Sequence, residues 1–315
     1  MQSADDRALT TTDEASDRLD RGAPTAPCRR VQPIDDPSDP RLDRFRDLIA
    51  RGDRPDADDF FAESEIAVAR LLASPHFTTR AVLGTPAHLA RLDIPSNCEA
   101  LAVSRASLRA VLGFDLHRGV IACGTRPPAL VPDLSLGTCP IGPVLGADSL
   151  AALLARPTFT ALLVQGLADP ANLGSILRSA RAFAVDLVLL DRRGADPLAR
   201  RTIRAAMGHV FHQPLALVAD LSAALDLLKS ADVENWAATV GPRARPIAGL
   251  VRPPRLVLMV GNEGAGLPAP LLARADLELT IPIAPEVDSL GVATATAVLL
   301  HALQPRANSP HPDGI

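Results

Sequence analysis

Four cysteines are all that this sequence contains, and no two of them have the C-x-x-C spacing typical of a zinc site. Their scatter along the chain disfavours a disulfide framework and favours free thiols in the cytosol. An apolar run of membrane length and an N-terminal signal pattern are also absent. We therefore expect a soluble, cytoplasmic protein that holds no metal and does not associate with a membrane. The cysteines are Cys28, Cys98, Cys123 and Cys139.

A strongly basic charge is missing as well, which argues against a protein that binds nucleic acid through its overall charge. The net charge is −4. The imbalance is local, because residues 1–60 carry 15 acidic and 10 basic side chains and the rest of the chain is close to neutral. Lys229 is the only lysine among 32 basic residues, so arginine supplies nearly all of the positive charge. Arginine makes bidentate contacts to phosphate, which is compatible with an RNA partner, although a compositional bias would give the same count.

The first 40 residues are acidic and are interrupted by serine, threonine and proline, which predicts disorder. Residues 41–126 alternate short strand-like and helix-like patterns, and we interpret them as a small α/β domain that binds the substrate. His117 is either an RNA contact or a structural histidine at a turn. The predicted helices cover 41–51, 60–72, 87–92 and 104–112, and the predicted strands cover 80–84, 99–103 and 120–124.

Residues 127–148 are rich in proline and glycine and have no clear period, so we interpret them as a linker. A second domain over 149–305 alternates strands with helices, which predicts a mostly parallel sheet covered on both faces, and residues 306–315 form a flexible tail. Its predicted strands cover 161–165, 186–191, 215–218, 235–240, 256–260 and 277–281. Its predicted helices cover 150–155 (with Ser149 as N-cap), 172 or 173 to 184, 197–207, 221–230 and 292–303.

The stretch from Leu256 to Pro268 organises the second domain. Five apolar residues predict a buried strand, a turn with three glycines follows, and Pro268 opens a helix. Ligands of open parallel sheets sit beyond the carboxyl ends of the strands. There glycines let the backbone approach a ligand, and the lone acid Glu263 can accept from a hydroxyl or position a base. An ordinary strand-turn-helix corner is the alternative. The spacing is not that of the dinucleotide fingerprint G-x-G-x-x-G.

Residues 169–181 form a second informative stretch, in which Asn172 lies where a loop meets a helix. Arg178 is six residues further on, which places it about 120° away in helical projection. The two side chains share one site only if Asn172 belongs to the loop rather than to the helix. In the alternative interpretation Asn172 is an N-cap and Arg178 is a solvated charge.

The third stretch, residues 281–298, is an extended loop broken by prolines that ends in a helix of small residues. Read alone, it indicates a tightly packed terminal helix. In this order and spacing the three stretches resemble the SpoU (TrmH-like) RNA ribose 2'-O-methyltransferases of the SPOUT superfamily, over about 145 residues from Ala161 to Leu303. The resemblance rests on D-P-x-N-x-G-x-x-x-R from Asp169, G-N-E-G-x-G-L from Gly261 and I-P…S-L-x-V-A from Ile281.

The resemblance implies a C-terminal methyltransferase domain with a trefoil knot, a homodimer that completes the site, and the transfer of a methyl group from S-adenosylmethionine to a ribose 2'-hydroxyl of ribosomal or transfer RNA. The N-terminal unit resembles the ribosomal-protein-like substrate-binding domain of many members. The implied catalytic residues are Asn172, Arg178, Glu263 and Ser289. The implied cofactor contacts, mainly backbone groups, are at Thr239, Gly261, Ile281 and Leu290. Because the pKa of arginine is about 12.5 or more, we favour a positioning role for Arg178 over that of a base.

One residue departs from the family pattern, because Gly291 stands where the third motif commonly has asparagine. This departure keeps a second interpretation open, that of a catalytically impaired knotted protein that binds RNA. An enzyme on another α/β scaffold with a nucleotide cofactor is disfavoured by the order of the glycines. A group of arginines near the first motif is a candidate phosphate-binding face or, equally, a solvated helix surface. These arginines are Arg181, Arg192, Arg193, Arg200, Arg201 and Arg204.

Overall fold

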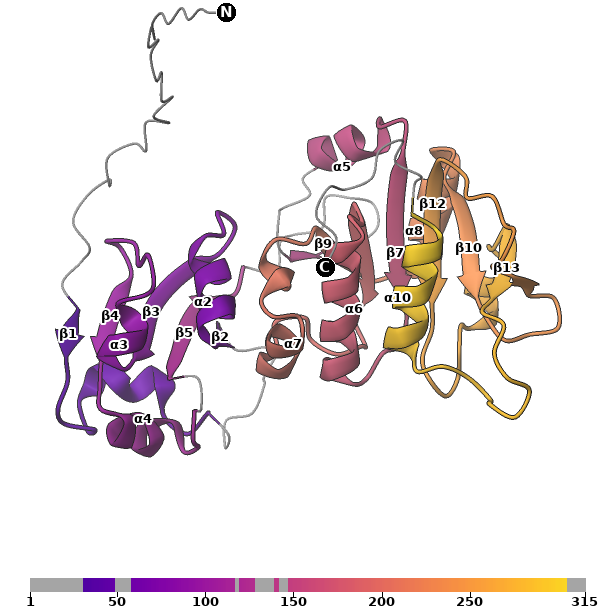
Figure 1. The fold of residues 1–315 in the computed structure, drawn as a ribbon. Helices are drawn as coiled ribbons and strands as arrows, with labels where there is room; N and C mark the ends of the chain where they lie inside the picture. The colour runs from indigo at the N-terminus through magenta and orange to yellow at the C-terminus, as the bar shows by residue number, and fades with distance from the viewer. Residues whose placement is uncertain (1–30, 49–57, 117–118, 128–138, 142–146, 305–315) are drawn as a thin grey trace, which may run out of the picture.

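The computed structural model describes residues 31–48, 58–116, 119–127, 139–141 and 147–304. They form two separate sheets, one of five strands in an N-terminal unit and one of eight strands in a C-terminal unit. Figure 1 shows the units side by side, with α2 (Glu65–Leu72) of the first near α7 (Arg200–Ala205) of the second. The predictions for His117, for Cys28 and for the tail over 306–315 lie outside the described residues.

The N-terminal unit is built on a sheet with the strand order β1-β4-β3-β5-β2. β4 is parallel to β1 and β3, whereas β5 is antiparallel to β3 and β2. The three strands predicted for this unit and the helix that starts after Ser104 are confirmed. The strands are β1 (Gln32–Pro33), β2 (Asp59–Glu63), β3 (Thr78–Gly84), β4 (Glu99–Ala102) and β5 (Val120–Thr125), and the helices are η1 (Pro40–Phe45, a 3-10 helix), α2, α3 (Pro86–Leu89) and α4 (Arg105–Leu112).

Three predictions for this unit differ from the structure. The predicted helix over 60–72 is strand β2 followed by α2, because Phe60 is buried against β5 and Ser64, with φ 90°, turns the chain before the helix begins. The part of the predicted disordered segment that the structure describes, residues 31–40, is folded, since β1 pairs with β4 and Ile34 is buried, and residues 1–30 lie outside the described residues. The predicted helix over 41–51 is the shorter η1, and its last three positions lie outside the described residues.

The C-terminal sheet has the strand order β11-β13-β10-β12-β7-β8-β9-β6. Every neighbouring pair is parallel except β6 and β9, so the prediction of a mostly parallel sheet is confirmed. The strands are β6 (Cys139–Ile141), β7 (Phe159–Val164), β8 (Leu187–Asp191), β9 (Leu215–Val218), β10 (Glu234–Ala238), β11 (Arg245–Pro246), β12 (Arg255–Val260) and β13 (Leu277–Thr280). The helices are α5 (Ala147–Leu154), α6 (Pro170–Ala182), α7, η2 (His209–Phe211, a 3-10 helix), α8 (Leu221–Ser230), α9 (Ala269–Leu272) and α10 (Val292–Ala302).

Helices cover both faces of this sheet. Leu162 and Val164 of β7 belong to the core that includes α6 and α10, whereas Ala161 and Leu163 belong to the core that includes α5, α8 and α9. This division follows from the period of two in a strand, which sends successive side chains to opposite faces. Figure 1 shows α6 and α10 next to each other on the face turned to the viewer. No helix of the described residues is long and apolar enough to cross a membrane.

The two units share a continuous hydrophobic core where they meet. Phe60 and Phe77 of the N-terminal unit pack against Phe211 of η2, and the three ring centroids lie 5.3–5.6 Å apart. Beside this cluster, Arg126 and Asp196 form an ion pair of 2.6 Å whose side chains are each only 13% exposed. Aromatic packing and a nearly buried ion pair hold the N-terminal unit in one orientation on the C-terminal unit.

The segment interpreted as a linker, 127–148, contributes to the sheet. Its residues 139–141 form β6, which pairs antiparallel with β9 at the edge of the sheet, while 128–138 and 142–146 lie outside the described residues. Helix α5 begins at Ala147, so the prediction that Ser149 caps a helix starting at Leu150 is wrong.

Candidate active site

The strand order reverses direction between β7 and β12. From β7 the chain continues to β8 and β9 on one side, whereas β12 and β10 lie on the other side. In open parallel sheets, ligands bind beyond the carboxyl ends of the strands at such a switch point. The two strands run in register and end together, at Val164 and Val260. The loops that follow them carry the first motif (residues 169–178) and the second motif (residues 261–267), so the fold brings these motifs to one crevice.

Asn262 ties the two loops together. Its Nδ2 donates to the carbonyl of Gly166 in the loop after β7, at 2.8 Å. Its Oδ1 accepts from the amides of Gly264 at 2.8 Å and Ala265 at 3.1 Å, which shapes the turn around the second motif. Sequence reasoning missed this role, although an asparagine inside a glycine-rich turn is a known signal for side-chain-to-backbone bonding.

Gly261 is the tightest point of the second motif. A β-carbon on Gly261 would lie 2.4 Å from the carbonyl carbon of Gly266 and 2.6 Å from the amide nitrogen of Leu267. These are backbone atoms that no side-chain rotation moves away. The turn therefore closes on itself only because this position is glycine.

A hydrogen bond links the first and second motifs directly. Nδ2 of Asn172 donates to Oε1 of Glu263 over 2.5 Å, across 91 positions of sequence. Helix α6 begins at Pro170 with Asp169 as its N-cap, so Asn172 is its third residue and not the cap. The predicted helix start at 172 or 173 is therefore two or three residues too late.

Arg178 does not join Asn172 and Glu263 within one chain. Because Asn172 is part of the helix, Arg178 lies about 120° around and about 9 Å along the axis from it. Its side chain is exposed and forms no ion pair with another described residue. The condition for a shared site, that Asn172 belong to the loop, is not met.

The third motif (residues 281–293) packs beside the first, because α10 lies against α6. The residues before α10, from Ala284 to Ser289, are all exposed, and Ser289 makes no hydrogen bond with Asn172 or Glu263. Gly291 precedes α10 with φ −53°, and a β-carbon there would meet no atom within 4 Å. Neither backbone conformation nor packing therefore requires glycine at this position.

Backbone groups at the same edge of the sheet are open to a ligand. Within the described parts of the chain, Gly261, Ile281 and Leu290 form no backbone hydrogen bond with another residue. Thr239, which follows β10, donates its amide to Leu279 at 2.9 Å and accepts at Oγ1 from Gly241 at 3.2 Å. Three of the four predicted cofactor contacts thus keep free backbone groups.

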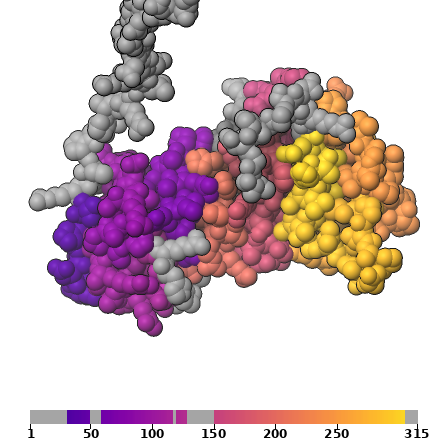
Figure 2. All heavy atoms as spheres, in the orientation of Figure 1, coloured from indigo at the N-terminus to yellow at the C-terminus, as the bar shows by residue number. Residues whose placement is uncertain are grey.

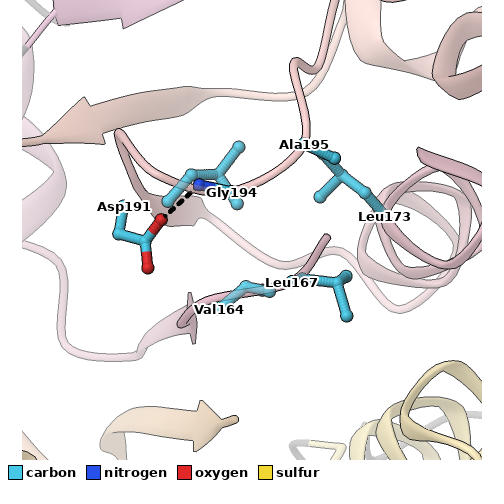
Figure 3. A pocket seen from close by; sticks show the side chains of 7 residues that line it. Val164, Leu167, Leu173, Asp191, Gly194 and Ala195 are labelled. Carbon is cyan, nitrogen blue, oxygen red and sulfur yellow. Dashed lines mark hydrogen bonds between the residues drawn. The ribbon is translucent and has the colours of Figure 1, made fainter. Parts of the chain in front are cut away.

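Asp191, at the end of β8, is an anchor that sequence reasoning also missed. Its carboxylate accepts from the amides of Gly166 at 2.5 Å, Arg193 at 3.0 Å and Gly194 at 2.7 Å. Figure 3 shows it beside a small hollow lined mainly by apolar side chains between the loops after β7 and β8. Through these three bonds to backbone amides, Asp191 fixes the loops after β7 and β8.

Two of the six arginines in the predicted face contact the N-terminal unit. The Arg200 guanidinium lies 4.6 Å from the centroid of the Phe114 ring in the N-terminal unit, and Arg204 pairs with Glu63 of β2 at 2.8 Å. Arg201 lies 3.8 Å from Asp169 and keeps 58% of its side chain exposed, and Arg181 is exposed on α6. Arg200 and Arg204 therefore join the two units, and neither forms a simple solvated helix surface.

Comparisons with known proteins agree with this geometry. Residues 160–301 match the profile of the SpoU rRNA Methylase family. A Mycobacterium bovis protein named as an uncharacterized tRNA/rRNA methyltransferase is 37% identical over 281 residues, which are 86% of this chain and 91% of that protein. The Bacillus subtilis 23S rRNA (guanosine(2553)-2'-O)-methyltransferase RlmP is 36% identical over 143 residues, covering 45% of this chain and 57% of its own length. The AdoMet-bound rRNA methyltransferase from Sinorhizobium meliloti superposes with a TM-score of 0.66 at 23% identity, over 86% of this chain and 97% of that one, a likeness of fold.

Proposed function

This chain belongs to the SpoU rRNA methylase family, and we propose that it transfers a methyl group from S-adenosylmethionine to a ribose 2'-hydroxyl of ribosomal or transfer RNA in the cytoplasm. The ribose specificity is supported by the Bacillus subtilis relative, whose name specifies 2'-O-methylation of 23S rRNA. Within the structure, the hydrogen bond between Asn172 and Glu263 carries the proposal, because it joins the first and second motifs at the switch point of the sheet.

The residues around the carboxyl ends of β10, β12 and β13 fit S-adenosylmethionine. Gly261, Ile281 and Leu290 offer unpaired backbone groups, and glycine at position 261 lets the turn of the second motif close on itself beside them. Val240 and Val287, in the loops after β10 and β13, are 74% and 45% exposed and supply apolar contact surface. A mostly apolar site with a few fixed polar groups is typical of cofactor binding.

Methyl transfer requires the protein to align the methyl group and the 2'-oxygen, and it needs no acid catalyst. When bound, S-adenosylmethionine supplies a methyl group on a positively charged sulfur. The protein then has to hold the 2'-oxygen in line with that methyl group and help the hydroxyl proton leave for solvent as the bond from oxygen to the methyl carbon forms and the bond from carbon to sulfur breaks. Asn172 and Glu263 fix each other at the crevice, and Ser289 lies on the neighbouring loop. We assign Arg178 to positioning the ribose or its phosphate, since a guanidinium does not give up its proton near neutral pH.

A homodimer reconciles the position of Arg178 with this role. Arg178 points away from the Asn172 and Glu263 of its own chain, so we infer that it completes the site of a second copy. Val298 of α10 is 40% exposed next to α6, on the face that such a dimer would cover. We also propose that the segment after β13 forms a trefoil knot, which the insertion of β12 between β7 and β10 supports.

Methyl transfer tests the proposal. RNA from cells that lack the gene is incubated with the protein and S-adenosylmethionine carrying a labelled methyl group, and 2'-O-methyl sites are mapped by mass spectrometry. We expect one new ribose methylation, which is absent from the same reaction with Arg178→Ala although that variant remains dimeric by light scattering and binds S-adenosylmethionine by calorimetry. Identical methylation patterns in cells with and without the gene would contradict the reaction, and RNA binding without cofactor binding would instead establish the impaired RNA-binding protein.

A further inference from the structure

We propose that the junction patch, formed by Arg70 of α2, Arg178 and Arg181 of α6, and His209 and His212 at η2, holds the phosphate backbone of the substrate RNA. The proposal rests on the proposed function, because it takes RNA as the substrate. It adds a surface that joins the N-terminal unit to the site of reaction. The patch differs from the predicted arginine face, whose members Arg200 and Arg204 are used in contacts between the units.

Arg70 is the member that crosses from one unit to the other. Its Nη1 donates to the carbonyl of Met207, just before η2, over 2.5 Å. Its own backbone carbonyl accepts from Nε2 of His212 at 2.9 Å. These two bonds hold the Arg70 guanidinium and the His212 ring in fixed positions at the junction, where the rest of the guanidinium can bind an anion. A positive group held in place loses less conformational entropy on binding than a free surface arginine.

The two arginines of α6 extend the patch toward the C-terminal unit. Arg178 and Arg181 are three residues apart, so they lie on one face of the helix, and both are exposed. Helix α6 contacts η2, which brings these arginines near His209. Figure 1 shows α2, α7 and α6 following one another across the face turned to the viewer, and Figure 2 shows the units in contact there.

The charge of the patch is not neutralised by the protein. No carboxylate of the described residues forms an ion pair with Arg70, Arg178 or Arg181. Burial, and after it the positive charges of Arg70, Arg181 and Arg178, lower the pKa of His209 to about 4. Burial and neighbouring positive charges, Arg181 and Arg70 among them, also lower the pKa of His212, although its bond to the Arg70 carbonyl opposes this. Three positive charges around neutral imidazoles favour an incoming anion.

The chemistry of the patch selects RNA phosphates as its occupant. Guanidinium groups bind phosphate oxygens through paired hydrogen bonds, and the neutral His209 ring adds one N–H donor. The single N–H of neutral His212 is already donated to the Arg70 carbonyl, so His212 holds Arg70 in place and does not bind the phosphate itself. Only 3% of the residues are aromatic, so the chain has few rings on which bases could stack, and backbone charge has to supply most of the affinity. Since the patch ends at Arg178, which we assign to the site of a second copy, a strand bound along it would lead from the N-terminal unit to the ribose that reacts in that copy.

RNA affinity of Arg181 variants tests the patch. The Arg181 side chain forms no hydrogen bond or ion pair with another described residue, so Arg181→Gln should fold normally, and Arg181→Lys keeps the charge. We use a fluorescein-labelled 20-nucleotide single-stranded RNA of mixed sequence and measure Kd at several salt concentrations. Loss of one phosphate contact should weaken binding about fivefold at 0.1 M salt and reduce the slope of log K against log salt by about 0.7. Arg181→Lys should keep the slope. Arg109→Gln, an exposed arginine on α4 outside the patch, should bind like the wild type.

Arg70→Gln provides a second variant, with its thermal stability measured because Arg70 also holds the Met207 carbonyl. We expect a similar loss of RNA affinity, a raised KM for RNA, an unchanged kcat and unchanged affinity for S-adenosylmethionine. Wild-type RNA affinity in both Arg181→Gln and Arg70→Gln would overturn the patch, as would a parallel loss of cofactor affinity. A wild-type protein that transfers no methyl group, while Arg181→Gln still binds RNA more weakly, would refute the proposed reaction and leave the RNA surface standing.

Discussion

Arg204 on α7 donates a hydrogen bond of 2.8 Å to Glu63 at the end of β2, and the Glu63 side chain is only 8% exposed. The arginine keeps 57% of its own side chain exposed, so the pair reaches from solvent into the junction between the units. A carboxylate in such a position depends on its partner, because a buried charge without one is unfavourable.

Arg204→Ala should therefore destabilise the protein. The Glu63 carboxylate would stay buried without its ion pair, at a cost of about 1–2 kcal/mol in the free energy of unfolding. Urea denaturation measures the change. Arg201→Ala is the matched control, because Arg201 is 58% exposed and its ion pair with the half-exposed Asp169 is long, at 3.8 Å. We expect this substitution to change the free energy of unfolding by no more than about 0.5 kcal/mol. Equal effects of the two substitutions would contradict this account of the junction.

The bond between Asn172 and Glu263 can be tested by exchanging donor and acceptor. Asn172→Asp places two carboxylates at 2.5 Å, so we expect kcat/KM for methyl transfer to fall about 100-fold through repulsion within the site. The double variant Asn172→Asp with Glu263→Gln restores a donor and an acceptor in reversed order and should recover much of the loss. No recovery would indicate that one of these side chains acts on the substrate itself rather than through the other.

Gly261→Ala should disrupt the turn of the second motif, whereas the same substitution at Gly264 should be tolerated. The new methyl group would lie 2.4 Å from backbone of Gly266, so the turn has to shift and we expect a loss of about 1–3 kcal/mol in stability together with at least tenfold weaker binding of S-adenosylmethionine. Gly264→Ala is the control, since the nearest atom there is Oδ1 of Asn262 at 3.5 Å. Titration calorimetry separates the two, and normal cofactor affinity in Gly261→Ala would remove this turn from the binding site.

The junction should make the protein sensitive to mild acid. Burial, and then the positive charges of Arg70, Arg181 and Arg178, lower the pKa of His209 from 6.5 to about 4. Above pH 6.5 the ring is neutral in folded and unfolded chains alike. As pH falls from 6.5 toward 4, His209 is protonated in the unfolded chain but stays neutral in the folded chain, so the free energy of unfolding declines over this window.

Melting temperatures at pH 7, 6 and 5 measure this decline, and His209→Gln should flatten it. His212, whose pKa is lowered mainly by burial, should contribute in the same direction. Titration of the ring protons by NMR gives the second reading. A His209 ring that takes up its proton near pH 6.5 in the folded protein would contradict the packing described at η2.

Local sequence patterns specify much of the C-terminal unit. The apolar run before Gly261 is β12, and α8 begins after Asp220, whose carboxylate accepts from the amides of Ser222 and Ala223, and ends at Ser230 as predicted. Such elements are readable because a buried strand or a capped amphipathic helix is specified by neighbouring residues alone. The order of the three motifs was sufficient to indicate the family and its cofactor.

Contacts between distant segments decided the rest. Phe60 lies in a strand because its backbone pairs with β5, and the residues close to Phe60 in the sequence do not reveal that pairing. The start of α6 at Pro170 puts Asn172 on the helix and turns Arg178 away from it, which is why we infer a site shared between two copies of the chain. Arg204 is a junction residue only because Glu63, 141 positions earlier, is buried opposite it. Sequence patterns therefore specified the strands, helices and motif chemistry, whereas pairings across long separations, whose free energy depends on both partners, were set by the tertiary structure alone.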